Sequence, residues 1–443
     1  MSFPAYAEYR DSNVGWLGGL PAHWQTMRFS RVVSIAEGQV DPRVEPYASM
    51  VLIAPNHIEG GTGRLVALET AADQGADSGK YQFATGEVIY SKIRPALAKV
   101  VLAPCDGLCS ADMYPLRGVE GLTSPYLKWV LLCPEFTAWA VLESDRVAMP
   151  KINREKLNEF RLPIPSVEEQ RTIAAFLDRE TDKIDALVEA QERLITLLKE
   201  KRQAVISHAV TKGLDPSAPM KDSGVEWLGQ VPAYWEVTAL KRLCTLITDG
   251  AHISPETENG VYCFVSTRDV SQAGIDFDGC LRTSEASYEY LYRTGCQPKV
   301  GDVLFSKDGT IGRTVVVREQ RDFVVASSLI IIRPDREILD AEFLDFLCQS
   351  DAIQDQVESF VKGAGLPRLS IANLMRVIGI FPPIHEQRLI ATTLAEASVR
   401  FTALVAEAEA AITLLQERRA ALISAAVTGK IDVRGLVQTA EAA

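Results

Sequence analysis

The sequence predicts an α+β protein in which two similar mixed α/β domains are separated by two long helices that pair as an antiparallel intramolecular coiled coil. Three observations lead to this prediction. A stretch rich in helix-forming residues occurs twice, a segment with two tryptophans precedes each of two variable regions, and both variable regions contain short β-branched runs. This ordered repeat predicts a pseudo-twofold molecule.

The two long stretches span Pro165–Thr211 and Pro382–Thr428, and they align without a gap. Glu169-Gln170-Arg171 in the first therefore matches Glu386-Gln387-Arg388 in the second. After the opening prolines neither stretch contains Pro or Gly, and both are rich in strong helix formers. Each predicts one helix of about 45 residues, about 65–70 Å long. The helix dipole favours the acids in each first turn.

Apolar residues recur every seven positions in both stretches, as in the seam of a coiled coil. The midpoint of the seam is weak in each copy, with Gln191 in one and Ala408 in the other. Two equivalent seams in one chain most simply pack on each other; the alternative is that each helix packs on its own domain. The expected seam residues are Leu177, Ile184, Leu187, Leu194, Leu198, Val205, Leu394, Phe401, Leu404, Leu415 and Leu422.

The segments before the variable regions are also repeated, and we refer to them as the lead segments. Asp11–Trp24 reads DSNVGWLGGLPAHW, and Asp222–Trp235 reads DSGVEWLGQVPAYW. A shared Trp-Leu-Gly indicates a turn, and each tryptophan is expected to be a large buried anchor. We interpret the lead segments as packing elements.

The variable regions have diverged, yet two faint similarities remain. GEVIYSKIRP at 86–95 resembles GDVLFSKDGT at 301–310, and MPKIN at 149–153 resembles LPRLS at 366–370. Runs such as VIY, VVL, VLF and SLIII predict strands within a mixed sheet and helix fold. The chain is therefore expected to comprise a first domain with its lead segment at 1–160, a long helix at 161–213, a second domain at 214–377, and a second long helix with a tail at 378–443.

Composition limits the possible functions. The chain has 46 Lys and Arg against 58 Asp and Glu, a formal net charge of −12, which argues against non-specific coating of nucleic acid. We expect no membrane span and no secretory signal. The eight cysteines are scattered without a zinc-binding pattern, which fits a reducing cytoplasm.

Taken together, these features resemble the specificity subunit of a Type I DNA restriction–modification system. The resemblance rests on three repeated features. They are the lead segments, the Ser-Lys segments at 86–95 and 301–310, and the proline-rich stretch before each Glu-Gln-Arg motif. It implies that each variable region is a target recognition domain that reads one half of a split double-stranded DNA site. It further implies that the helices bind two adenine-methyltransferase (modification) subunits, with motor–nuclease (restriction) subunits joining the complex.

The sequence is consistent with a subunit that is not an enzyme. It contains no methyl-donor glycine loop after a strand, no Asn-Pro-Pro-aromatic motif and no Walker A loop. The five histidines lack the spacing of metal ligands or of a catalytic triad. We therefore expect no catalytic residue, no metal and no cofactor.

DNA contacts should come from Lys and Arg at glycine-rich loops and at the repeated strand, because phosphates supply most of the affinity. Each of these cations could instead only solvate the surface. We expect Lys307→Ala to weaken DNA binding at all sequences. The candidate DNA-binding residues are Arg64, Lys92, Arg94, Lys151, Lys307, Arg313 and Arg368.

Two domains that read one face of B-DNA predict half-sites centred about 10 bp apart. The helices would then set the gap, and a helix lengthened by one turn should change it. Three alternatives remain open: a coiled-coil adaptor without DNA sequence specificity, a self-sufficient methyltransferase or nuclease, and a DNA-reading subunit of another restriction class.

Overall fold

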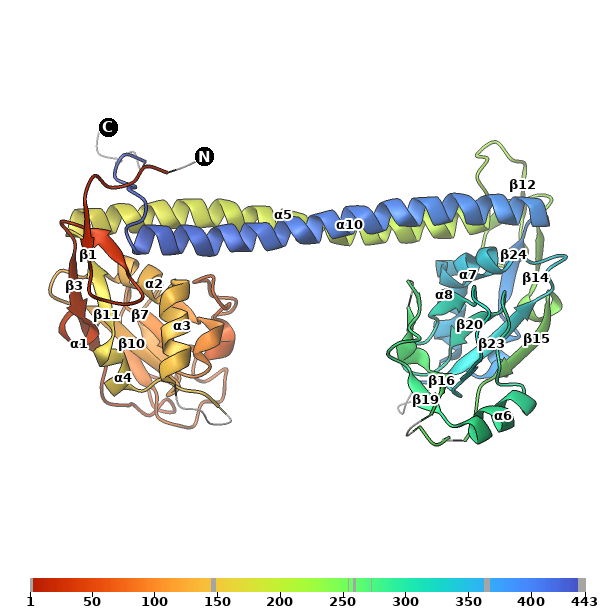
Figure 1. Cartoon of the computed structure of the whole chain (residues 1–443), viewed down its shortest axis with the longest axis horizontal. Helices are drawn as coiled ribbons and strands as arrows, with labels where there is room; N and C mark the ends of the chain where they lie inside the picture. Colours follow the sequence, from red (N-terminus) through yellow and green to blue (C-terminus); the bar gives the residue numbers. More distant parts are fainter. Residues whose placement is uncertain are drawn as a thin grey trace. The chain divides into compact units, whose positions relative to one another are not determined.

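The computed structural model describes residues 3–144, 149–253, 255–257, 260–271, 273–361 and 367–436. Its contacts divide the chain into two units, Met1–Gln191 with Ala410–Ala443 and Glu192–Glu409. Each unit holds one mixed α/β domain and part of both long helices (Figure 1). The predicted fold class is confirmed.

The first domain is built on a four-stranded antiparallel sheet in the order β4-β10-β7-β8. Helix α2 packs on this sheet and buries Tyr126, Leu127 and Trp129 in the core. A smaller sheet, β5-β9-β6, contains a parallel pair. The bounds are β3 Gln25–Arg28, α1 Phe29–Val32, β4 Val33–Ile35, β5 Val51–Ile53, η1 Pro55–His57, β6 Tyr81–Phe83, β7 Val88–Ser91, η2 Pro95–Leu97, β8 Val100–Leu102, β9 Gly107–Cys109, β10 Met113–Gly118, α2 Ser124–Leu132, α3 Pro134–Glu143, α4 Arg154–Glu159 and β11 Arg161–Ile164.

The second domain repeats this topology with a sheet in the order β15-β23-β20-β21, a smaller sheet β19-β16-β22, and α7 in the place of α2. It adds a helix, α6, between β19 and β20, and its hairpin β17-β18 takes the place of the isolated bridge Ile58–Leu65 of the first domain. The bounds are β14 Glu236–Ala239, η3 Leu240–Arg242, β15 Cys244–Asp249, β16 Tyr262–Val265, η4 Thr267–Asp269, β17 Val270–Ser271, β18 Gly274–Ile275, β19 Leu281–Thr283, α6 Glu285–Arg293, β20 Val303–Ser306, β21 Thr314–Val316, β22 Phe323–Val325, β23 Leu329–Pro334, α7 Ala341–Gln349, α8 Asp351–Phe360, α9 Ile371–Leu374 and β24 Ile378–Phe381.

The long helices are α5 (Val167–Lys212) and α10 (Ile384–Val427), as the helix-forming composition predicted. In the first unit, the beginning of α5 and the end of α10 share one core, which includes Leu177 and Leu422. In the second unit, the end of α5 and the beginning of α10 do the same, with Val210 and Leu394. The helix portions in each unit run antiparallel (Figure 1).

Three expected seam residues are exposed. Leu187, Leu194 and Leu404 have 52%, 43% and 46% of their surface accessible. Seam positions follow one another in alternating steps of four and three residues, and each step here leads to the residue after the expected leucine. The seam positions are therefore taken by half-buried residues, Val188, Ile195 and Val405.

The lead segments form matched hairpins, β1 (Tyr9–Asp11) with β2 (Gly19–Pro21), and β12 (Met220–Asp222) with β13 (Gln230–Pro232). Trp24 and Trp235 are fully buried, as expected of anchors. The expectation fails for the first tryptophan of the second copy, because Trp227 is half exposed. Trp16, its counterpart, stacks on Phe160 with ring centroids 5.1 Å apart.

Helix α10 corrects the expectation that no segment is apolar enough to span a membrane. A window in Ile384–Val427 reaches a mean hydropathy of 1.4 with few charged residues. One such helix is a weak indication of a membrane span, and α10 packs against α5 within each unit.

Candidate nucleic-acid interface

The two segments that remain similar between the variable regions contact each other in both domains. In the first domain, the amide N of Ile152 donates to the carbonyl O of Lys92 over 2.9 Å, and Ile93 bridges to Lys151. In the second, Leu369 donates in the same way to Lys307 over 3.0 Å, and Asp308 bridges to Arg368. We call each pair of segments a junction. Leu366, which opens the second LPRLS segment, lies outside the described residues.

The first junction gathers basic and aromatic side chains. Arg94 and Lys151 are exposed, and the amide N of Arg94 donates to the carbonyl O of Pro150 over 2.7 Å. Lys92 Nζ lies 5.2 Å from the centroid of the Tyr114 ring. The junction therefore presents cations beside an aromatic face, a combination that suits a phosphate backbone.

Arg154 follows directly after the MPKIN segment and belongs to the same junction. Its guanidinium lies 5.3 Å from the Tyr114 ring centroid and 5.8 Å from that of Tyr81. It also donates to the carbonyl O of Ala36 over 2.6 Å. These contacts hold a fourth cation in a fixed orientation.

The second junction places acids next to its cations. Lys307 is buried, with 3% of its surface exposed, and its ammonium donates to the Asp249 carboxylate. His252 Nε2 lies 3.0 Å from Asp249 Oδ2. Burial works against ionisation of Asp249, but Lys307 and His252 hold its pKa below the usual value. Lys307 thus has a structural partner, and Lys307→Ala would leave Asp249 without its ammonium.

The other two candidate DNA-binding residues of the second domain, Arg368 and Arg313, also have protein partners. Arg368 Nε lies 3.0 Å from Asp308 Oδ1, with half of the Arg368 side chain exposed. Arg313 Nη1 donates to the carbonyl O of Val270 over 2.8 Å. Arg313 also lines a groove of about 730 Å³, together with Gln203 of α5. This neighbourhood ties the 310–314 loop to the β17-β18 hairpin.

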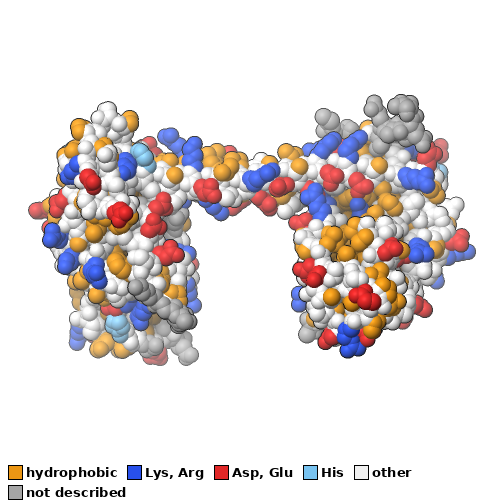
Figure 2. All heavy atoms as spheres, turned by 180° about the vertical axis from the view of Figure 1, so that it is seen from behind, with side chains coloured by type: hydrophobic (Ala, Val, Ile, Leu, Met, Phe, Trp, Pro, Cys, Tyr) orange, Lys and Arg blue, Asp and Glu red, His pale blue; other side chains and the backbone are white. Residues whose placement is uncertain are grey.

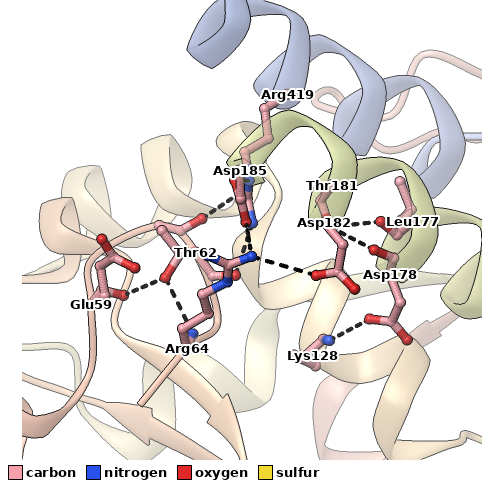
Figure 3. Close-up of polar contacts among 11 residues, drawn as sticks. Glu59, Thr62, Arg64, Lys128, Leu177, Asp178, Thr181, Asp182, Asp185 and Arg419 are labelled. Carbon is pink, nitrogen blue, oxygen red and sulfur yellow. Dashed lines mark hydrogen bonds and ion pairs between the residues drawn. The ribbon is translucent and has the colours of Figure 1, made fainter. Parts of the chain in front are cut away.

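Arg64 is directed at the long helices and not at a junction (Figure 3). Arg64 Nη2 lies 3.2 Å from Asp185 Oδ2 and 3.6 Å from Asp182 Oδ1, both on α5. Arg419 of α10 reaches the same turn and donates to the carbonyl O atoms of Gly61 and Thr62 over 2.6 and 2.8 Å. The glycine-rich turn therefore contacts the helices.

Charges on the exposed surface are mixed. On the face seen in Figure 2, basic and acidic side chains are interspersed over both units. Both variable regions contain more acids than bases. The first junction is thus a local cluster of cations on a chain that is acidic as a whole.

The Glu-Gln-Arg motifs connect each long helix to its domain. The Gln170 side chain accepts from the amide N of Thr123, at the start of α2, over 2.8 Å. Gln387 accepts from Asp340, at the start of α7, over 2.8 Å. Both glutamines are fully buried. They therefore fix each domain against the first turn of its long helix.

The glutamates of these motifs hold the lead segments. Glu169 Oε2 lies 3.1 Å from His23 Nε2 in the first lead segment, and Glu386 accepts a hydrogen bond from Trp235 Nε1 over 3.2 Å in the second. The helix dipole was sufficient to explain an acid at these positions. The structure adds a specific partner for each one.

Sequence reasoning missed several residues of these sites. Arg154 could have been found because it directly follows the MPKIN repeat. Asp249 and His252 carried no signal, because they approach Lys307 only through the pairing of β15 with β23 and of β23 with β20. Arg419 carried no signal either, because a single arginine within a long amphipathic helix gives no indication of its partner.

A family model described as Type I restriction modification DNA specificity domain matches residues 21–196 and 232–414. The chain is 35% identical over 193 residues to the Type I restriction enzyme EcoDI specificity subunit of Escherichia coli, covering 44% of this chain and 43% of that protein. It is 23% identical over 303 residues to the MjaVIII specificity subunit of Methanocaldococcus jannaschii, covering 66% and 67%. The match to the EcoDI protein thus spans less than half of that relative.

Solved structures share the fold. A chain from a study of complex assembly and conformational transition of the type I R-M system aligns with a TM-score of 0.73 at 19% identity, covering 92% of this chain and 98% of that one. The HsdS subunit from Thermoanaerobacter tengcongensis aligns with a TM-score of 0.52 at 19% identity, covering 93% and 98%. Since the family model matches twice and covers most of the sequence, the chain belongs to the Type I restriction modification DNA specificity family.

Proposed function

We propose that the chain is a sequence-specific DNA-recognition subunit that reads a split double-stranded target, with one half-site for each domain. The observation that carries this proposal is the duplicated junction. The same two segments meet in both domains, whereas the side chains around them differ. A shared frame with different surfaces suits two readers of different sequences.

The first junction is the part best suited to hold DNA. Arg94 and Lys151 are exposed next to each other, and Lys92 and Arg154 lie beside Tyr114. These cations would contact phosphates and position the domain, while neighbouring polar side chains would read base edges. In the second domain Arg313 and Arg368 remain candidates. Their printed partners, Val270 and Asp308, would orient them.

The acidic chain needs partners to bind DNA tightly. With a formal net charge of −12, the isolated chain should bind weakly and lose affinity steeply with salt. The partners that the resemblance implies are two adenine-methyltransferase subunits and motor–nuclease subunits, and relatives named as specificity subunits of Type I restriction enzymes support a place within such a complex. The chain would act without catalysis or a cofactor of its own, in the cytoplasm.

The test is to co-express the chain with its cognate methyltransferase subunit in a host that lacks adenine methylation, and to sequence the modified genome. We expect methylated adenine in both halves of one interrupted motif, with half-sites centred about 10 bp apart. The methyltransferase subunit expressed alone is the control and should leave no such motif. An uninterrupted motif would contradict the proposal, and the absence of any motif would favour an adaptor without DNA specificity.

A further inference from the structure

The turn at residues 59–64 connects the first recognition domain to both long helices of its unit (Figure 3). The Arg419 guanidinium uses all three of its nitrogens: Nε lies 3.1 Å from Asp185 Oδ1, and the other two donate to Gly61 and Thr62. The second oxygen of Asp185 faces Arg64 at 3.2 Å. One carboxylate of α5 therefore joins an arginine of α10 to an arginine of the turn. We call these contacts the clamp.

The Arg419–Asp185 contact of the clamp is shielded from water, whereas the Arg64 side chain is 45% exposed. The side chains of Arg419 and Asp185 are each 10% exposed. The Arg419 guanidinium also lies 5.8 Å from the centroid of the Trp129 ring, on helix α2. Charged hydrogen bonds in such a setting are strong and directional.

The backbone of the turn fits this contact closely. Gly61 and Gly63 have φ values of +73° and +81°, a conformation that favours glycine. A Cβ at Gly60 would lie 2.8 Å from the carbonyl O of Leu97, and one at Gly63 would lie 3.1 Å from the Leu132 side chain. Side chains at these positions would therefore strain the turn or collide with the domain that carries it.

The second unit has an open groove at the corresponding helix positions. Because the long helices align without a gap, the clamp residues can be matched one by one: Asp182, Asp185 and Arg419 correspond to Val399, Thr402 and Arg202. These three residues of the second unit line a groove of about 740 Å³. No turn of the second domain's described residues fills this groove.

The hairpins that follow β5 and β16 differ in length. Six residues separate Ile58 from Leu65, which bridge each other in the first domain, whereas four separate Val270 from Ile275 in the second. Of the described residues of the shorter hairpin, Ala273 lines the groove. The two added residues allow the first hairpin to reach Arg419.

We propose that Arg419 is a positioning residue, which locks the first recognition domain onto its helices through the 59–64 turn and thereby enforces the gap between the half-sites. This proposal rests on the proposed function. Among the described residues, the hydrogen bonds and ion pairs of Arg419, Asp185 and Arg64 do not involve a junction segment, so the base sequence of the half-sites should not depend on the clamp. Its loss should instead permit the domain to rock on the helices and accept other gaps.

The test uses the full chain with its cognate methyltransferase subunit and duplexes that carry both half-sites with the native gap or with one base pair more or less. The measured quantity is the ratio of methylation at the native gap to that at altered gaps. In Arg419→Ala this ratio should fall about tenfold, a change equivalent to the loss of one charge-assisted hydrogen bond. Arg419→Lys keeps the charge but not the three-way fork, and its ratio should be intermediate.

Arg418→Ala is the matched control, because Arg418 is the exposed neighbour on α10, and its ratio should equal that of the unaltered chain. Hydrogen exchange at residues 57–66 of the full chain provides a second readout and should accelerate in Arg419→Ala. If exchange accelerates while the gap ratio stays unchanged, the positioning role is overturned. Unchanged exchange would overturn the clamp itself.

Arg64→Gln serves if Arg419→Ala does not fold, since it leaves Arg419 paired with Asp185. It should relax the gap less than Arg419→Ala and still accelerate exchange in the turn. An unchanged ratio and unchanged exchange would contradict the proposal. If the unaltered chain marks no split site, the proposed function fails, whereas hydrogen exchange still decides whether the clamp exists.

Discussion

The two recognition domains share a topology but attach to the long helices through different charges. In the first unit, the buried arginine of the seam, Arg419, takes its carboxylate from Asp185 on the facing helix. In the second unit, Arg202 occupies the matching position, and the nearby carboxylate is Asp345 of helix α7. The residue that matches Asp345 in the first domain is Lys128 of α2. In the first unit α5 carries the acids and the domain helix α2 carries a base, whereas in the second unit α5 carries the base and the domain helix α7 carries the acid.

This difference shows how a duplicated frame can diverge without losing its fold. The contacts that are the same in both units, those of Gln170 and Gln387 with the starts of α2 and α7, hold the architecture. The contacts that differ lie further along the helices, where one domain reaches the seam and the other leaves a groove. Substitutions at matched positions can separate these two roles.

The largest effect is expected at Arg419. Arg419→Ala leaves Asp185 buried without its main partner and two carbonyl groups without a donor, which should cost about 3–4 kcal/mol of unfolding free energy in the first unit. Arg202→Ala should cost about 1 kcal/mol, because Arg202 is only half-buried and Asp345 can take up a proton. Hydrogen exchange in α2 and α7 reports the stability of each unit separately. Equal losses in both variants would break the comparison.

Asp345 should make the second unit sensitive to pH. Burial raises the pKa of Asp345 to about 6 from its ordinary 3.8, and Glu342 adds to the shift while Thr314, Arg318 and Gln349 oppose it. A carboxyl whose pKa is higher in the folded state lowers the free energy of unfolding as pH rises. Here this loss occurs between about pH 4 and about pH 6 and is complete above that range. Asp345→Asn should therefore stabilise the second unit by about 2–3 kcal/mol at pH 8 and flatten this pH dependence.

Lys128→Asn provides the comparison for Asp345→Asn. Lys128 forms an ion pair of 2.7 Å with Asp178, whose side chain is about half exposed. Its removal should cost less than about 1 kcal/mol in the first unit. Thermal denaturation followed from pH 4 to pH 8 measures both variants. A first unit as sensitive to pH as the second would contradict the exchange of charges.

The shared contacts should respond equally. Gln170→Ala and Gln387→Ala each leave buried backbone groups without partners, which should cost about 2 kcal/mol per variant. The local stability of α2 and α7, measured by hydrogen exchange, should fall by the same amount. A large loss in one unit and none in the other would show that the frame is not shared at this point.

The smallest effect is expected at Leu187 and Leu404, which occupy matching positions in the two helices and are about half exposed. Leu187→Ala and Leu404→Ala should each change the free energy of unfolding by less than about 0.5 kcal/mol. Ile184→Ala, at a buried seam position, should cost at least about 2 kcal/mol. Denaturant titration distinguishes these values. A large loss of unfolding free energy in Leu187→Ala would indicate that Leu187 is a seam residue.

The parts of the fold that depend on local sequence patterns could be predicted. Two long helices follow from runs without Pro or Gly, and the strand β7 follows from the VIY run. The predicted seam is one residue off at Leu187, because the four-residue step from Ile184 leads to Val188. Trp227 shows that a repeated motif need not be buried in both copies.

The candidate site was predictable only in part, because it depends on which segments meet. The pairing of Lys92 with Ile152 joins segments far apart in sequence, and the repeat hinted at it without showing the contact. Arg64 and Lys307 were selected as exposed cations, yet each faces an acid that no local pattern indicates. Side-chain partners set by tertiary pairing cannot be read from spacing.

The most direct test of the account exchanges one recognition domain. Residues 236–381, from β14 to β24, would be replaced by the matching segment of a family member with a different target, and the methylated motif would be sequenced with the cognate methyltransferase subunit present. The account predicts that one half-site changes while the other half-site and the gap are retained. A motif that stays the same, or one in which both halves change, would contradict the claim that each domain reads its own half.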